Sequence, residues 1–370
     1  MKMNVKVISS ISMLILLSGV FAAMIGDVSE GAEPTVITDG TGRTFEYTEP
    51  TERIVTMGYA STLTVAMLGQ IGKIIAVDTY STYEYTGDER LKNLDAANMG
   101  SIYTASNNDK IVAQFVQWVQ EGKMSLDDTI ILTTYANANV LRDSLMDPEI
   151  GFTKVLVYLS VTSYDQVVDF VRSMSVIVTG GVSPLADEME LVKTIIGEKL
   201  EGITEKAKGL GVWYSAASGF SVLNMASITA SLIETAGGIN VGYNPDMDPR
   251  WYGTAITVLQ LAAANPDAVI FLSDTYIRNG HTVGDFRNDV LGGNSSIPIV
   301  VVNSTWNNYC PDAAVGLWAF ACALYPDLFE GPAPFADDQP SDSSLVLYAA
   351  VGVLAAAMVM AAAFFIMKRP

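Results

Sequence analysis

The sequence predicts an α/β protein of two lobes joined by one long helix, and three observations carry this prediction. Residues 183–207 place apolar side chains three and four positions apart, which gives a helix with one continuous apolar face. Short apolar runs alternate with helical patterns before this segment, and the same alternation follows it. The alternative is that this segment is one helix within a single large domain.

The predicted long helix, residues 184–207, carries signals for a helix start and a helix end. Ser183 is a favourable N-cap, and Pro184 suits the first helical position. Lysines and Gly209 follow the last apolar position, as is common where helices end. At about 1.5 Å per residue the helix would measure roughly 36 Å and would act as a rigid strut. It belongs to a helical connection, residues 163–208, that begins with a capping box of Ser163 and Gln166.

Composition limits the class of partner and the covalent chemistry. The chain has 370 residues, enough for two domains, and a formal net charge of −19 with a single histidine. It has no basic stripe that could neutralise phosphates, so a nucleic-acid partner is not expected. A helix predicted over 312–324 would hold Cys310 and Cys322 about 16 Å or more apart, too far for a disulfide.

The two ends of the chain predict export and anchoring. Residues 1–23 combine lysines, an apolar run and a small-residue pair, as in a signal peptide. Residues 345–367 carry no charge and are long enough to span a bilayer, with Lys368 and Arg369 expected on the cytoplasmic side. A flexible linker is predicted at 331–344. We therefore expect an extracytoplasmic body on the cell membrane, a single-pass anchor and a cytoplasmic C-terminus. The alternative for the apolar segment is a buried core helix.

The first predicted lobe, residues 34–162, opens with a hairpin and continues with parallel strands. Turn residues at 39–42 separate two short β-prone runs. Further strands are predicted at 54–57, 74–77, 130–134 and 155–159.

Tyrosines gather where the strands of this lobe end, and ligands of open α/β sheets bind at these carboxyl ends. Phenol oxygens can bind hard cations such as ferric iron, and the rings can stack on flat macrocycles. The alternative for each is ordinary half-buried packing. The candidate ligand residues are Tyr59, Tyr80, Tyr83, Tyr85, Tyr103 and Tyr135.

The second predicted lobe, residues 209–330, repeats the pattern. Strands are predicted at 210–214, 268–272 and 297–302. Helices are predicted from Ser227 to the Gly237-Gly238 pair and over 255–264. The candidate ligand residues near element ends are Trp251, Tyr252, Arg278, His281 and Trp306.

These candidates have both functional and ordinary interpretations. His281 could ligate haem iron or corrinoid cobalt, but a solvated loop histidine is the favoured interpretation. Arg278 could bind a carboxylate of a ferric chelate or a haem propionate in a bidentate manner, or could be a surface cation. Trp251, Tyr252 and Trp306 favour stacking on a flat ligand slightly over core packing.

The motifs of common enzyme classes are missing from the sequence. It contains no phosphate loop of the GxxxxGK[ST] or GxGxxG type, no HExxH and no G-x-S-x-G elbow. We therefore expect a binding protein and not an enzyme, without a resident cofactor and with no metal ligand assigned directly. Asn294 and Asn303 begin glycosylation triplets.

Five pieces of the chain resemble a known family in order. They are ITDGTGRTF, ERIVTMGYASTLTVAMLG, ETAGGINV, WYG with LQLAAANPDAVIFL, and IPIVVVNSTWNN before LYPDLF. The chain resembles the helical-backbone (class III) substrate-binding proteins of ABC transporters for ferric chelates, haem and cobalamin. The resemblance covers nearly all of residues 35–330. It implies the periplasmic-binding-protein fold of two Rossmann-like lobes, with ligand held between them and little hinge movement.

The resemblance implies partners as well, with one departure. Members of the family carry a glutamate on the outer surface of each lobe that docks on the permease, and the matching positions here are Leu63 and Leu259. Docking on an ABC permease and its ATPase is therefore in question, whereas ligand capture is not. The predicted function is capture of a metal chelate, with a ferric siderophore-like complex first and cobalamin or haem second. The alternative is a tethered storage or adhesion module without a permease.

Overall fold

The computed structural model describes residues 35–334 except 48, 102–106, 134–137, 159–160, 182 and 294–295. The predicted signal peptide, the apolar segment 345–367 and most of the linker lie outside the described residues, as do Tyr103, Tyr135 and Asn294. Within the described part of the chain, no helix has the length and apolar character needed to cross a membrane.

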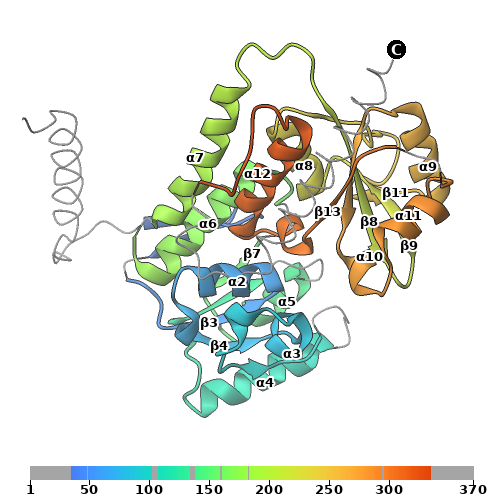
Figure 1. Ribbon diagram of the computed structural model, residues 1–370. Helices are drawn as coiled ribbons and strands as arrows, with labels where there is room; N and C mark the ends of the chain where they lie inside the picture. The colour runs from blue at the N-terminus through green and yellow to red at the C-terminus, as the bar shows by residue number, and fades with distance from the viewer. Residues whose placement is uncertain are drawn as a thin grey trace, which may run out of the picture.

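Two α/β lobes are present, as predicted (Figure 1). The first lobe opens with an antiparallel hairpin, at the position that the turn residues predict. Its five-stranded sheet is parallel throughout, in the order β5-β4-β3-β6-β7. The strands are β1 (Thr35–Thr38), β2 (Thr44–Tyr47), β3 (Arg53–Met57), β4 (Ile74–Val77), β5 (Ala97–Asn98), β6 (Thr129–Thr133) and β7 (Val155–Val157).

Helices of the first lobe alternate with these strands, as parallel pairing requires. The α-helices are α2 (Tyr59–Met67), α3 (Tyr83–Thr86), α4 (Asn108–Gln120) and α5 (Ala138–Leu145). Three short 3₁₀ helices lie between them: η1 (Ile71–Lys73), η2 (Thr79–Ser81) and η3 (Glu89–Leu91).

The connection between the lobes is a pair of helices, α6 (Tyr164–Thr179) and α7 (Pro184–Lys199). The predicted capping box at Ser163 is confirmed, and the Ser183 side chain caps α7 by accepting the Leu185 N–H at 3.2 Å. Ion pairs link Asp165 to Lys193 and Arg172 to Glu190, so the two helices run antiparallel.

The prediction that the long helix extends to residue 207 is wrong. Helix α7 ends at Lys199 after 16 residues, which corresponds to about 24 Å. Gly202 adopts a left-handed φ of 84°, and Ile203 is exposed, so the apolar face does not continue. A two-helix unit therefore joins the lobes in place of one strut.

The sheet of the second lobe is mixed. Strands β8, β12 and β13 are parallel, whereas β8 and β9 form an antiparallel hairpin with its turn at residues 216–218, and β9 is a strand that the sequence analysis did not predict. The order is β11-β9-β8-β12-β13, and β10 also pairs with β8. The strands are β8 (Lys208–Ser215), β9 (Gly219–Leu223), β10 (Ile239–Asn240), β11 (Trp251–Tyr252), β12 (Val269–Ser273) and β13 (Ile299–Val302).

Helices of the second lobe include two at their predicted positions, α9 and α12. The helices are α8 (Ile228–Thr235), α9 (Ala255–Ala264), α10 (Thr275–Arg278), α11 (Val283–Asp289), η5 (Ser304–Asn307) and α12 (Asp312–Leu324). Cys310 and Cys322 are both buried and free.

One buried apolar cluster extends across the connection into both lobes. It includes Ile54 of the first sheet, Phe271 of the second, and side chains of α6, α7, α8 and α12. Phe271 stacks on Phe320 of α12 with ring centroids 3.9 Å apart. Because the helices and both sheets share this core, a change in the angle between the lobes would disturb close packing.

Candidate functional site

A buried carboxylate fixes the loops at the carboxyl ends of the first sheet. Asp78 follows β4 and accepts hydrogen bonds from the N–H of Gly58 at 2.9 Å and the N–H of Tyr80 at 3.1 Å, and from the Ser81 hydroxyl. Burial raises the pKa of Asp78, and these hydrogen bonds oppose the rise. The loops after β3 and β4, which carry Tyr59 and Tyr80, are thereby tied together.

Three of the predicted tyrosines lie close together on η2 and α3. Tyr80 meets Tyr85 edge-on, with ring centroids 4.9 Å apart, and its hydroxyl lies 3.2 Å from the Ser101 Oγ. Tyr83 donates to Glu89 at 2.7 Å, whereas Tyr85 is 62% exposed. A shallow depression of about 230 Å³ adjoins them at the carboxyl ends of β4 and β5, lined by Val77, Thr82, Tyr83, Glu84, Lys92, Leu94, Ala96 and Asn98.

The hydroxyls of Tyr59 and Tyr83 both donate to carboxylates. Tyr59 lies 2.5 Å from Asp88, and burial, followed by the nearby Asp88 charge, raises the pKa of Tyr59 far above its ordinary value. The hydrogen bond to Glu89 raises the pKa of Tyr83. Both phenols are therefore protonated near neutral pH, and each directs its single hydrogen at a carboxylate of the first lobe.

A half-buried carboxylate organises the second lobe. Asp274 follows β12 and accepts the Ser304 N–H at 3.0 Å. Arg278 Nη2 lies 3.2 Å from Asp274 Oδ1 and 2.5 Å from Ser304 Oγ. The Arg278 side chain is 56% exposed, so one side of a fixed guanidinium faces solvent. Burial raises the pKa of Asp274, against the opposing charge of Arg278 and the hydrogen bonds from Ser304.

His281 lies in a loop, as expected, and this loop connects the short helices α10 and α11. The imidazole stacks on Tyr276 with centroids 4.4 Å apart and planes 7° from parallel, and it meets Tyr214 edge-on at 5.8 Å. His281 is half-buried and extends a row of aromatic rings.

Of the three remaining candidates, Trp251 and Tyr252 lie on a strand distant from the β12 end, and Trp306 is buried. Trp251 is 52% exposed, and the Tyr252 hydroxyl donates to the Gly242 carbonyl at 2.9 Å. Their strand, β11, is three strands from β12, which is about 14 Å at the usual strand spacing. Trp306 is 5% exposed and packs against Gly316 of α12, so its ring lies in the core.

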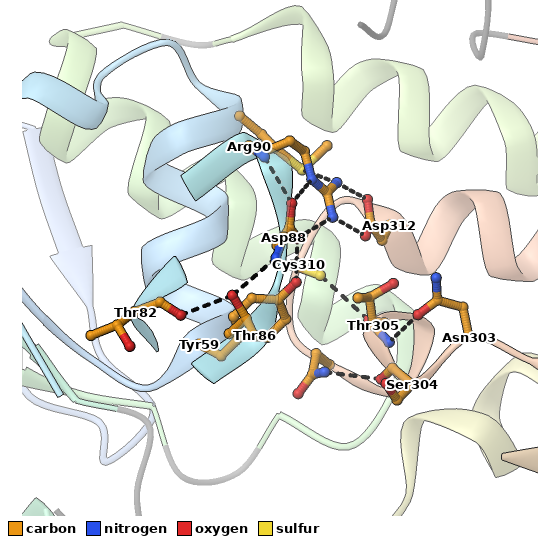
Figure 2. Close-up of polar contacts among 12 residues, drawn as sticks. Tyr59, Thr82, Thr86, Asp88, Arg90, Asn303, Ser304, Thr305, Cys310 and Asp312 are labelled. Carbon is orange, nitrogen blue, oxygen red and sulfur yellow. Dashed lines mark hydrogen bonds and ion pairs between the residues drawn. The ribbon is translucent and has the colours of Figure 1, made fainter. Parts of the chain in front are cut away.

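An ion pair and an apolar contact join the two lobes directly, and the sequence analysis predicted neither (Figure 2). Arg90 of η3 forms a two-pronged ion pair with Asp312 at the start of α12, with distances of 2.7 and 2.8 Å. Cys310 is fully buried against Leu63 and Leu91 of the first lobe. No local spacing signals these contacts, because Arg90 and Asp312 are 222 positions apart.

The expectation that Leu63 lies on the outer surface is wrong. Its side chain is 0% exposed and packs where the lobes meet, so this position cannot dock a permease. Leu259 is 39% exposed on α9. Asn303, the described glycosylation candidate, accepts the Thr305 N–H and caps η5.

The described residues contain no group of three or more histidine, cysteine, aspartate or glutamate side chains placed to hold a metal ion. The groups that could contact a ligand at the strand ends are therefore protonated phenols, one fixed guanidinium and several aromatic rings. Such groups can bind a ligand through hydrogen bonds, charge and stacking.

No protein-family model and no curated protein matches the sequence, but solved structures share its fold. The nickel-bound CeuE of Helicobacter pylori is similar with a TM-score of 0.55 and 13% identity, over 80% of this chain and 90% of that one. An Fe³⁺-hydroxamate transport protein from Saccharomonospora viridis has a TM-score of 0.52 and 18% identity, over 77% and 96%. The haem-binding RhuT from Roseiflexus has a TM-score of 0.54 and 16% identity, over 75% and 98%. The chain therefore has the two-lobed α/β fold of the periplasmic class III binding proteins, as the resemblance predicts.

Proposed function

We propose that the protein is an extracytoplasmic solute-binding protein that captures a metal chelate where its two lobes meet. The observation that carries the proposal is the pairing of two fixed groups at strand ends. The first lobe offers tyrosines tied by Asp78, and the second offers Arg278 tied by Asp274. Groups held in place before the ligand arrives bind with less loss of side-chain entropy.

The ligand would be a complete chelate and not a bare metal ion. The hydroxyls of Tyr59 and Tyr83 already donate their single hydrogens to Asp88 and Glu89, so neither offers a phenolate to a bare ion, and the chelate's own atoms would surround the metal. A ferric siderophore-like complex is the first choice, because Arg278 complements a carboxylate. Haem or cobalamin is the second choice, supported by the exposed Tyr85 ring and by the rings around His281.

The proposed location and partners follow from the chain ends and the fold. Residues 1–23 would direct export, and 345–367 would hold the body on the outer side of the cell membrane. The similar structures include a component of an Fe³⁺-hydroxamate transport system, which supports delivery to an ABC permease and its ATPase. Leu259 on the surface of α9 favours the second candidate, a tethered storage or adhesion module, because it offers no charge for docking.

Ligand titration tests the proposal. The purified protein would be titrated with a ferric hydroxamate, ferric citrate, haemin and cobalamin, with quenching of its tyrosine and tryptophan fluorescence as the readout. The iron-free hydroxamate serves as the matched control. We expect micromolar or tighter binding of one ferric chelate, about −8 kcal/mol or better, and weaker binding of the iron-free form. Absence of binding to all four complexes would reject the chelate-binding function.

A further inference from the structure

A two-pronged ion pair between the lobes centres on one guanidinium. Arg90 Nη1 donates to Asp312 Oδ1 at 2.7 Å, and Arg90 Nη2 donates to Asp312 Oδ2 at 2.8 Å, as Figure 2 shows. Arg90 belongs to the first lobe, whereas Asp312 is the first residue of α12. Two parallel charge-assisted hydrogen bonds fix both the distance and the direction between their partners.

The same guanidinium is held from the side of the first lobe. Arg90 Nε and Nη2 donate to the two oxygens of Asp88 at 2.9 and 2.7 Å, and Asp88 also accepts the Tyr59 hydroxyl. The side chains of Arg90, Asp88 and Asp312 are 23%, 11% and 9% exposed, so salt screens them little. Arg90 therefore lies between one carboxylate from each lobe. If Asp312 moves away, Arg90 keeps Asp88, and the break falls at the boundary between the lobes.

An apolar contact lies next to this ion pair. Cys310, two residues before α12, is 0% exposed and packs on Leu63 and Leu91 of the first lobe. The adjacent Tyr309 carbonyl accepts a hydrogen bond from Thr64 at 3.4 Å. The Cys310 thiol is therefore covered by the other lobe, and separation of the lobes would uncover it. Burial raises the pKa of this thiol, which makes it unreactive while the lobes touch.

The second cysteine provides an internal reference. Cys322 lies near the other end of α12, within the core cluster that the connection and both lobes share, and it is 5% exposed. Burial raises its pKa to about 11. Separation at Arg90 would leave Cys322 covered, whereas unfolding of the whole chain would expose both thiols.

We propose that Arg90 is a latch between the lobes: it holds the start of α12 against the first lobe and sets the separation between the Tyr59 loop and the loop at 303–308. The latch is a property of the protein without ligand, so it does not depend on which chelate is bound. Its rupture allows local opening at the junction without unfolding of the shared core.

Thiol labelling of the full-length chain tests the latch. Asp312→Asn keeps the shape of the side chain and removes its charge, and Arg90→Lys keeps the charge and removes the two-pronged geometry. The matched control is Lys208→Gln, which removes an ion pair with Asp267 within the second lobe. Each protein is treated with iodoacetamide, and the modification of Cys310 and of Cys322 is followed separately by peptide mass spectrometry.

We expect Cys310 to react about tenfold faster or more in both junction variants. Loss of one charge-assisted hydrogen bond raises the population of the opened junction by about this factor. Cys322 should react at its wild-type rate, and the control should change neither thiol. Unchanged Cys310 labelling in the folded variants would overturn the latch. Parallel acceleration of both cysteines would also overturn it, because it indicates general loosening.

If neither variant folds, thiol labelling of the wild-type chain in urea still tests the latch. At a urea concentration below the unfolding transition, a latch predicts faster labelling of Cys310 than of Cys322, although Cys310 is the more buried thiol. Equal labelling rates would mean that the junction opens only with the whole molecule, and would overturn the proposal. Failure of the chelate titration would leave this result untouched, so the two proposals fail independently.

Discussion

Asp78 and Asp274 occupy matching positions in the two lobes. Each directly follows a parallel strand, and each accepts a backbone N–H from the loop after the neighbouring strand. The Gly58 N–H lies 2.9 Å from Asp78, and the Ser304 N–H lies 3.0 Å from Asp274. Two unrelated stretches of sequence thus fix the loops at their strand ends by the same means, because a carboxylate that is partly or fully removed from water needs donors and the loop ends supply them.

Asp78→Asn should destabilise the protein by an amount that depends on pH. The asparagine amide turns an N–H₂ group toward at least one of the three donors, which costs about 1–3 kcal/mol. Burial raises the folded-state pKa of Asp78, so its stabilising effect is complete below the ordinary aspartate pKa. That effect declines as the pH rises through the raised value. The difference between wild type and variant should therefore be larger at about pH 4 than at about pH 7.

Urea unfolding of both proteins at the two pH values measures this difference. Subtracting one protein from the other removes the titration of the remaining carboxylates, which the two share. Asp246→Asn, on a surface loop, is the matched control and should change stability little at either pH. A cost that grows toward neutral pH would show that the hydrogen bonds outweigh burial at Asp78.

Much of the fold is predictable from short-range patterns. The hairpin at 39–42, the strand at Ile74–Val77 and the helix at Ala255–Ala264 each have their own turn, apolar run or cap, so tertiary contacts are not needed to place them. The capping box at Ser163 is confirmed for the same reason. Alternation of strands and helices then leads to two lobes, with a parallel sheet in the first and parallel pairing of β8, β12 and β13 in the second.

Features that depend on distant partners were not predictable. The end of α7 at Lys199 is set by Gly202 and by the lack of packing around Ile203, although the apolar spacing continues in the sequence. The ion pair of Arg90 with Asp312 connects lobes that the sequence separates. Trp306 follows a strand like a ligand-facing residue, yet the small Gly316 leaves room for its ring in the core. Whether the candidate residues contact ligand stays a prediction.

Gly316→Ala should destabilise the protein, and Gly197→Ala should stabilise it. A Cβ at Gly316 would lie 2.7 Å from Trp306 Cβ, so the buried ring must shift, at about 1–3 kcal/mol. At Gly197 a Cβ meets nothing within 4 Å, and the helix gains about 0.5–1 kcal/mol from alanine. Both glycines lie within helices, which makes the pair a matched comparison. Equal urea midpoints for the two variants would contradict the packing role of Trp306.

His281→Phe distinguishes the two ligand choices. Phenylalanine keeps a ring that can stack on Tyr276 and removes both imidazole nitrogens. If a ferric chelate is the ligand, its affinity should change by no more than about threefold. That change is smaller than a tenfold change in affinity, which corresponds to about 1.4 kcal/mol of binding free energy. The matched variant His281→Ala should lose stability by about 0.5–1.5 kcal/mol through the lost ring contact. Haem would be favoured by two results together. The wild-type protein would bind no ferric chelate, and both variants would lose the absorption band that wild type shows with haemin.

Arg278→Gln should weaken binding of carboxylate-bearing ferric chelates selectively. Asp274 and Ser304 hold Nη2, and among the described residues Nη1 and Nε have no partner, so that edge is open to a carboxylate. Loss of a charged hydrogen bond costs about 1.5–3 kcal/mol, or about 10- to 150-fold in affinity. Titration with ferric citrate and with an uncharged ferric hydroxamate measures the effect, and the loss should be confined to citrate. Arg172→Gln on α6, which removes a cation paired with Asp169 and with Glu190 of α7, is the control and should bind both chelates as wild type does. An equal loss for both chelates would mean that Arg278 shapes the second lobe and does not recognise the charge of the ligand.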